Sequence, residues 1–142
     1  MSLSLGLVLA VALSLPPISQ GPVSELCHNQ LRAGQRFEIA TSDRIVRGEF
    51  VDPKTGECVV ATSTTGHSFG PSQRVWLLGS TQGDQVGAGG LQLVLMHQVR
   101  VGMKIELGLG DLSRENRVLT KPVRSITLLG GPVASVQQTA LR

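Results

Sequence analysis

Residues 44–62 read RIVRGEFVDPKTGECVVAT, and this stretch decides the fold class. DPKTG, at 52–56, has the chemistry of a turn: the aspartate can accept backbone hydrogen bonds, the proline presets φ, and the glycine supplies the positive φ of a hairpin bulge. The residues on either side alternate between apolar and polar, which is typical of half-buried strands. The sequence therefore predicts an antiparallel hairpin whose strands end near Val51 and begin near Glu57.

The same alternation recurs along the chain between glycine-rich turns, as expected for a sequence with 17 glycines. In the segment MKIELGL it places Ile105 inward and Lys104 and Glu106 outward. The longest segment reads as one strand or as two that are broken near His97–Gln98. The strands are expected at RFEIAT (36–41), RIVRGEFV (44–51), ECVVAT (57–62), QRVWLLGS (73–80), LQLVLMHQVRV (91–101), MKIELGL (103–109), RVLT (117–120) and PVRSITLL (122–129). We therefore predict an all-β fold, a small antiparallel barrel or sandwich of about seven or eight short strands.

The length of 142 residues predicts a single β domain at 35–129 with flanking segments. Residues 1–21 are an apolar N-terminal segment and residues 130–142 a C-terminal tail. Between the first segment and the domain, residues 22–34 are expected to form a linker or one short N-terminal helix, with Ser24 as its N-cap and Gly34 as its stop.

The N-terminal segment has two interpretations. The apolar stretch from Leu3 to Leu15 has the length of a signal-peptide core and is too short to span a bilayer comfortably, but it lacks a basic start and a small-residue cleavage site. Its large residues also occupy the odd positions, as in a strand. A signal peptide or anchor predicts a secreted or cell-envelope protein, with membrane contact only through this segment. A folded strand predicts a cytoplasmic one.

Cys27 and Cys58 are the two cysteines of the chain. In an exported protein they could form one disulfide, which the chain-entropy model values at about 3–4 kcal/mol. In a cytosolic protein both are expected to be buried free thiols.

GHSFG, at 66–70, matches the G-x-S-x-G pattern of a hydrolase nucleophile, with Ser68, Asp84 and His97 in the order of a catalytic triad. That pattern requires a strand, a tight turn and a helix, whereas this segment reads as a loop between two strands. We therefore predict no catalytic residues, with a serine hydrolase using Ser68 kept as an alternative.

A metal site could be drawn from Cys27, His28, Cys58 and His67, but these residues lack the paired spacing of zinc ligands. The triplet Lys54-Thr55-Gly56 lies at the hairpin tip without the partner motifs of penicillin-recognising enzymes. The sequence therefore predicts neither a metal nor a cofactor.

Nucleic-acid binding is a second alternative. The net charge is +3, and six basic residues fall within one part of the chain: Arg100, Lys104, Arg114, Arg117, Lys121 and Arg124. Acidic residues lie among them, and the stretch contains no aromatic side chain on which a base could stack. The pattern favours a solvated face, with weak phosphate binding as the alternative.

Four stretches together resemble a group of small uncharacterised bacterial all-β proteins: RFEIATSDRIVRGEF, WLLGSTQG, VRVGMKIEL and LTKPVRSI. The last is similar to a recurring T-S-x-V-x-S-I ending, with Lys121 in place of the serine. The resemblance covers about two-thirds of the chain and implies a compact β domain, but no activity. Taken together, the sequence predicts a non-enzymatic structural or protein-binding β domain of an exported or envelope protein.

Overall fold

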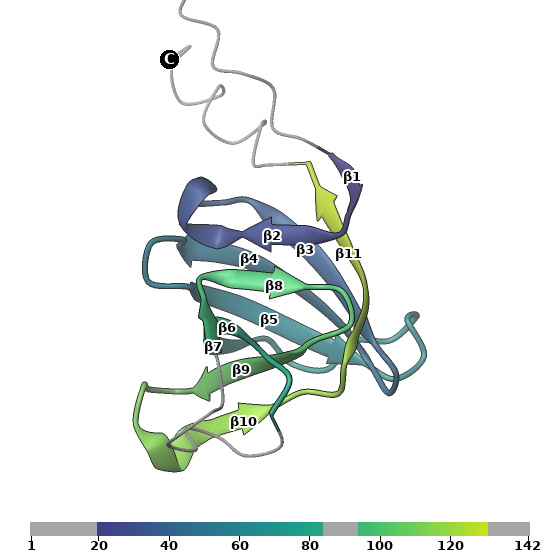
Figure 1. The fold of residues 1–142 in the computed structure, drawn as a ribbon. Helices are drawn as coiled ribbons and strands as arrows, with labels where there is room; N and C mark the ends of the chain where they lie inside the picture. The colour runs from purple at the N-terminus through teal and green to yellow at the C-terminus, as the bar shows by residue number, and fades with distance from the viewer. Residues whose placement is uncertain (1–19, 84–93, 131–142) are drawn as a thin grey trace, which may run out of the picture.

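The computed structural model describes residues 20–83 and 94–130, which form an antiparallel all-β fold, as predicted (Figure 1). Two short 3₁₀ helices interrupt the strands, η1 (His28–Gln30) and η2 (Arg114–Asn116). No helix in these two ranges is long and apolar enough to cross a membrane. The strands are β1 (Gly21–Val23), β2 (Glu25–Cys27), β3 (Arg36–Thr41), β4 (Ile45–Asp52), β5 (Glu57–Ser63), β6 (Gln73–Thr81), β7 (Val94–Met96), β8 (Gln98–Arg100), β9 (Lys104–Leu109), β10 (Arg117–Leu119) and β11 (Val123–Leu129).

Nine of these strands form one sheet, in the order β1-β11-β3-β4-β5-β6-β9-β10, with β7 added beside β6. The order ends at β1 and β10, so within the described residues this sheet is open and not a closed barrel. β2 and β8 form a separate two-stranded ribbon, which lies across the curved sheet in Figure 1. The sheet thus has a concave face, partly covered by the ribbon.

The segment at 22–34 differs from its prediction. It forms β1, β2 and the single turn η1, where the sequence predicted a linker or a helix capped by Ser24. β1 pairs with β11, and β2 pairs with β8, so long-range pairing overrides the weak local helix signal. Residues 1–19 of the N-terminal segment and residues 131–142 of the C-terminal tail lie outside the described residues, and the interpretations of both segments stay predictions.

The DPKTG turn joins β4 to β5 as predicted. The Asp52 carboxylate accepts a hydrogen bond from the Lys54 amide at 3.1 Å, and the Gly56 amide donates to the Asp52 carbonyl at 3.0 Å. Gly56 has a φ of +82°, and a Cβ atom there would collide with the carbonyl oxygen of Leu77. The Gly56 carbonyl in turn accepts a hydrogen bond from the Leu77 amide at 2.9 Å, which fixes the turn against β6.

The break predicted near His97–Gln98 is confirmed. His97 has a φ of +64°, which is rare outside glycine, and it separates β7 from β8. β7 continues the large sheet beside β6, whereas β8 turns away and pairs with β2. The single residue His97 therefore sends the chain from the sheet into the covering ribbon.

The hydrophobic core fills the space between the sheet and the ribbon. The rings of Phe37 and Phe50 lie 4.9 Å apart, and Leu26 and Val99 bring the ribbon onto the same cluster. The core consists of Leu26, Phe37, Ile39, Val46, Phe50, Cys58, Val60, Val75, Leu77, Val99, Ile105, Val123, Ile126 and Leu128. With so few aromatic residues, small β-branched side chains dominate it.

Glu106 corrects one prediction from the alternation. It faces away from the core as expected, but its side chain is buried instead of solvated. The guanidinium of Arg117, on the neighbouring strand β10, lies 3.3 Å from its carboxylate. A buried carboxylate needs such a partner, and the pairing of β9 with β10 provides it.

Candidate ligand-binding cavity

One half of the concave face is a wall built from residues that oppose each other across neighbouring strands. Residues directly opposite in an antiparallel pair point to the same side of the sheet, so each pair extends the wall by one strand. The wall runs from β4 to β10 through the pairs Val46–Thr62, Val60–Gln73, Val75–Leu109 and Leu107–Val118.

This wall encloses an open cavity of about 560 Å³, a volume typical of small-molecule sites. Seven apolar residues line it: Val46, Val60, Val75, Leu107, Leu109, Val118 and Leu119. Seven polar or charged residues complete the lining: Asp43, Arg44, Thr62, Gln73, Lys104, Thr120 and Lys121. The apolar lining residues therefore all lie on strands, whereas Asp43, Arg44 and Lys121 lie on connections at the mouth.

The floor of the cavity is the hydrophobic core itself. A second, much smaller and entirely apolar space of about 20 Å³ lies among core residues such as Phe37, Ile39 and Ile105. The two spaces share five lining residues: Val46, Val60, Val75, Leu107 and Thr120. A molecule in the open cavity would thus rest on tightly packed valine and leucine side chains.

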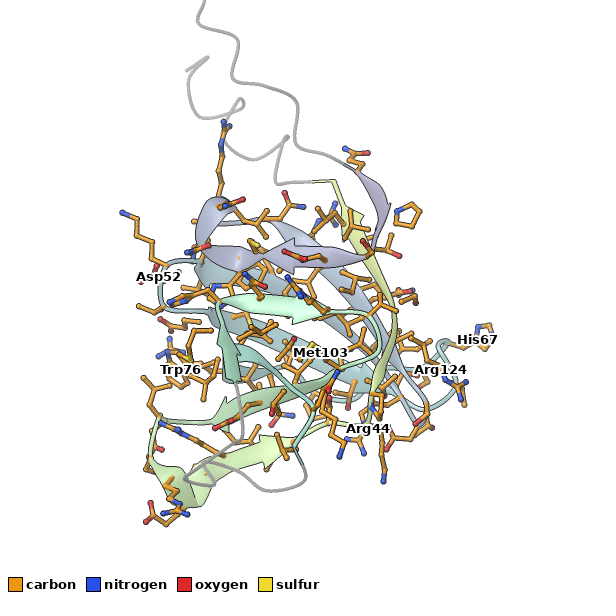
Figure 2. The ribbon with its side chains drawn as sticks, in the orientation of Figure 1. Arg44, Asp52, His67, Trp76, Met103 and Arg124 are labelled. Atoms are coloured by element: carbon orange, nitrogen blue, oxygen red, sulfur yellow. The ribbon has the colours of Figure 1, made fainter. Side chains whose placement is uncertain are left out.

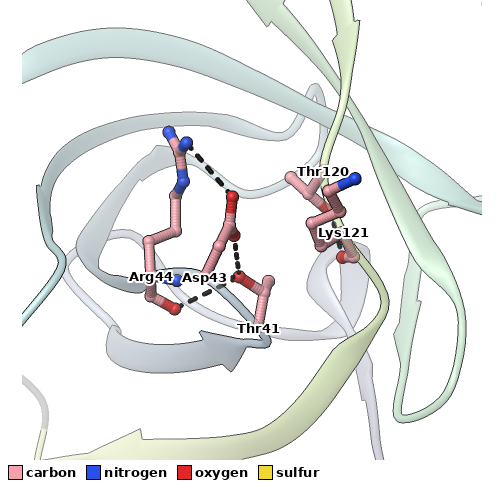
Figure 3. Close-up of polar contacts among 5 residues, drawn as sticks. All are labelled: Thr41, Asp43, Arg44, Thr120 and Lys121. Carbon is pink, nitrogen blue, oxygen red and sulfur yellow. Dashed lines mark hydrogen bonds and ion pairs between the residues drawn. The ribbon is translucent and has the colours of Figure 1, made fainter.

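One side of the mouth is the turn between β3 and β4, whose contacts Figure 3 shows. The Thr41 hydroxyl donates to a carboxylate oxygen of Asp43 at 2.8 Å, and Arg44 Nη2 lies 3.3 Å from the other carboxylate oxygen. The hydrogen bond from Thr41, together with the neighbouring Arg44, lowers the pKa of Asp43. Asp43 is therefore ionised at neutral pH, and its negative charge is partly neutralised by Arg44.

The other side of the mouth is the connection between β10 and β11. The Thr120 hydroxyl accepts a hydrogen bond from the Ile105 amide at 3.0 Å and donates to the Lys121 carbonyl at 2.8 Å. These bonds fix the backbone of Lys121 at the edge of the cavity, across from Arg44 (Figure 3). Lys104, at the start of β9, is the third cation of the mouth.

Among the described residues that line the cavity, the charges sum to +2, from three cations and the carboxylate of Asp43. Within residues 20–83 and 94–130, the Lys121 ammonium has no ion-pair partner, and the side chains of Thr62 and Gln73 make no hydrogen bond. The cavity therefore offers positive charge and hydrogen-bonding groups that are not engaged by the described protein. The described part of its lining contains no serine, cysteine or histidine that could act as a nucleophile or a proton shuttle.

The residues of the hydrolase hypothesis are not brought together. Ser68 is exposed in the loop after β5, whereas the ring of His97 packs on His28, with 5.2 Å between ring centres. His28 in turn bonds to the carbonyl of Pro53 in the DPKTG turn. Figure 2 shows this turn, marked by Asp52, and the Ser68 loop, marked by its neighbour His67, at opposite ends of the molecule. Asp84, the third residue of the hypothesis, lies outside the described residues.

The four residues considered as metal ligands are also dispersed. Cys27 lies at the surface, with its thiol 3.5 Å from Glu25, whereas Cys58 and His28 are buried and His67 is exposed on its loop. In the described part of the chain, no group of three or more histidine, cysteine, aspartate or glutamate residues could hold a metal ion. Cys27 and Cys58 are free thiols, so the disulfide that the sequence allows is not formed in this structure.

The six basic residues that suggested phosphate binding do not share one surface. Arg100 pairs with Glu25 at 3.0 Å, and Arg117 is engaged by Glu106. Lys104 and Lys121 line the cavity, and neither Arg114, on η2, nor Arg124, on β11, does so. The sequence pattern thus contained two cations of the cavity mouth, but it missed Arg44 and the apolar wall.

Comparison of the chain with protein-family models, with curated proteins and with solved structures gave no match. The assignment of a function therefore depends on the geometry of the cavity.

Proposed function

We propose that this protein is a non-enzymatic binding domain that holds a small molecule with an apolar body in the cavity of its concave face. The observation that carries the proposal is the cavity of about 560 Å³, with seven apolar residues on five neighbouring strands and a floor formed by the core. Leu109 and Val118 at its edge are each 37% exposed, so apolar surface continues to the opening. Removing such surface from water favours binding by about 25 cal/mol per Å².

The composition of the lining supports binding more than catalysis. Its ionisable side chains are three cations and one carboxylate, and that carboxylate is engaged by Thr41 and Arg44. General acid–base chemistry needs a group that exchanges protons near neutral pH, and nucleophilic chemistry needs an activated hydroxyl, thiol or amine. Apolar walls with a few polar groups are typical of sites that bind and release a small molecule.

The proposal can be tested with N-phenyl-1-naphthylamine, a neutral apolar fluorophore whose emission rises when it leaves water. Val118→Trp places a large side chain on the concave face at the cavity edge, where Val118 opposes Leu107. Val59→Trp is the matched control, because Val59 is 38% exposed and does not line the cavity.

The fluorophore is expected to bind the wild type and the Val59→Trp variant equally. Val118→Trp should reduce binding at least tenfold while circular dichroism and the melting temperature stay close to those of the wild type. Saturable binding that Val118→Trp leaves unchanged, or the absence of saturable binding to the wild type, would refute the proposal.

Protein binding, the role predicted from the sequence, is supported by a separate observation. Among the strands that the structure describes, β10 lies at an edge of the sheet, and Leu112, in the loop that precedes it, is 46% exposed. Unpaired edges beside apolar side chains are common sites of strand addition by a partner. A photo-crosslinking residue at position 112, expressed in the native host, should capture a specific protein that the same residue at Val51, 47% exposed at the DPKTG hairpin, does not. Equal capture from both positions would count against this role.

A further inference from the structure

We infer that the ligand of the cavity is an anionic amphiphile, with a carboxylate or similar head at Lys121 and Arg44 and an apolar chain along the wall from β10 to β4. This inference rests on the proposed function and adds the chemical class of the ligand. It follows from the way in which charge and apolar surface are separated within one cavity.

The positive charge of the cavity comes from three parts of the chain that are far apart in sequence. Arg44 comes from the β3–β4 turn, Lys104 from the start of β9, and Lys121 from the connection after β10. Lys104 is engaged, since its Nζ donates a hydrogen bond to the Gly83 carbonyl at 3.3 Å. Arg44 and Lys121 repel one another across the mouth, which costs free energy unless an anion lies between them. Asp43, the one carboxylate among the lining residues that the structure describes, is already bonded to Thr41 and Arg44.

Lys121 is the residue best placed to meet the head of the ligand. Its backbone is held by the Thr120 hydroxyl, and its ammonium makes no ion pair with any residue of the described ranges. Arg44 uses Nη2 toward Asp43, which leaves further N–H groups of its guanidinium for a second anion. An oxyanion between these two side chains would accept hydrogen bonds from the Lys121 ammonium and from the remaining N–H groups of Arg44.

The unpartnered polar groups of the wall fit the same ligand. Thr62 and Gln73 lie on β5 and β6 beside Val60, close to the mouth, and neither side chain has a hydrogen-bond partner in the structure as described. They can donate to a head-group oxygen. Beyond them the lining is valine and leucine, which can only pack against hydrocarbon.

The inference is tested with three probes that share one chain length: dodecanoate, its methyl ester and dodecyltrimethylammonium. Each is titrated calorimetrically, the two ionic probes below their critical micelle concentrations and the ester below its solubility limit. Dodecanoate should bind at least tenfold more tightly than the ester, and the ammonium probe should bind most weakly. Lys121→Gln should weaken dodecanoate about three- to tenfold and leave the ester unchanged. Lys54→Gln, an equal charge change at the DPKTG turn outside the cavity, should alter neither.

The outcomes separate this inference from the proposed function. If neither the ester nor dodecanoate binds, the cavity is not a ligand site and the proposed function fails with it. If the ester binds as tightly as dodecanoate, or if Lys121→Gln weakens the binding of both equally, the cavity binds ligands but does not select an anionic head group. The inference then fails while the proposed function stands. Binding to phosphatidylglycerol vesicles without binding of monomeric dodecanoate would also overturn the inference, because the partner would then be a membrane surface.

Discussion

The Nη1 atom of Arg117 lies 3.3 Å from the Oε1 atom of Glu106, and it joins β10 to β9 through a carboxylate whose side chain is only 3% exposed. Because β9 is the one neighbour of β10 in the described sheet, this ion pair helps to hold the outer wall of the cavity in place. Leu119, opposite Glu106 in the register, and Val118 beside it both line the cavity.

Arg117→Ala should therefore destabilise the protein by about 1–3 kcal/mol, since it leaves the buried carboxylate without its cation. The loss is below that of a fully buried pair because the Arg117 side chain is 33% exposed. Urea unfolding measures it, with Arg114→Ala on η2 as a control that should change stability by less than about 0.5 kcal/mol. Adding Glu106→Gln should restore part of the loss, and equal losses in the single and double variants would contradict this account.

Much of the fold follows from local signals in the sequence, and the cavity does not. DPKTG predicted the β4–β5 hairpin, and alternation predicted β3 and most of the later strands, because backbone geometry imposes a period of two. Alternation also told which face of β9 meets the core. The alternation could not predict that Glu106 is buried on the opposite face. The burial depends on Arg117, which lies beside Glu106 only when β10 pairs with β9.

The cavity was not predictable for a related reason. Its wall takes one or two residues from each of several strands, and Val46 or Val75 looks like any other core residue in the sequence. The register between the strands places these residues around the concave face, where their side chains leave the volume of the cavity unfilled. Lys104 and Lys121 stood out as charges, but their convergence with Arg44 depends on three separate connections.

The close packing of the DPKTG turn on β6 predicts a large effect at Gly56. Gly56→Ala should cost at least about 2 kcal/mol, because alanine disfavours a φ of +82° and its Cβ would collide with the Leu77 carbonyl. Gly102→Ala is the matched control: its φ is +90°, but no atom lies within 4 Å of the added Cβ, so only the backbone strain of about 1 kcal/mol remains. Thermal unfolding of the two variants should show the difference, and equal melting temperatures would rule out the collision.

His28 should make the protein sensitive to mild acid. Burial lowers the pKa of His28, and the nearby His97 lowers it further, against the hydrogen bond to the Pro53 carbonyl. Below the ordinary pKa of 6.5 the unfolded chain then binds a proton more readily than the folded one, so stability falls as the pH falls from about 7 to 5. The lowered pKa values of Asp43 and Asp111 act only at more acidic pH.

The variant His28→Phe measures this contribution. It should be less stable than the wild type at pH 8, because it loses the hydrogen bond to the Pro53 carbonyl. The difference in free energy of unfolding between the two proteins should narrow toward pH 5. His67→Gln, in the exposed loop, should keep the pH dependence of the wild type. If the difference in free energy of unfolding between the wild type and His28→Phe stays constant with pH, His28 is excluded as the titrating group.

The two cysteines should differ in reactivity. Burial raises the pKa of the Cys58 thiol to about 12, and Cys58 is fully buried on β5. Burial and the adjacent Glu25 also raise the pKa of Cys27, but its side chain reaches the surface. Since the thiolate is the reactive form, iodoacetamide at pH 8 should label Cys27 slowly and Cys58 only after unfolding in urea. No labelling of either before reduction, with a gain of two hydrogens on reduction, would instead show the disulfide.

Asp43 should oppose the binding of an anion at the mouth of the cavity. Its carboxylate is the one negative charge that residues 20–83 and 94–130 place in the lining, and it lies beside Arg44, which the inferred head group would contact. Asp43→Asn should therefore strengthen the binding of dodecanoate about two- to threefold and leave the methyl ester unchanged. The asparagine oxygen can still accept the hydrogen bond from Thr41, so the β3–β4 turn should persist and stability should change little. Calorimetric titration at low salt and again at 0.5 M salt measures the effect, which should shrink at high salt because the charges are exposed. An affinity for dodecanoate that falls in Asp43→Asn would mean that the carboxylate orders Arg44 for the ligand more than it repels the head group.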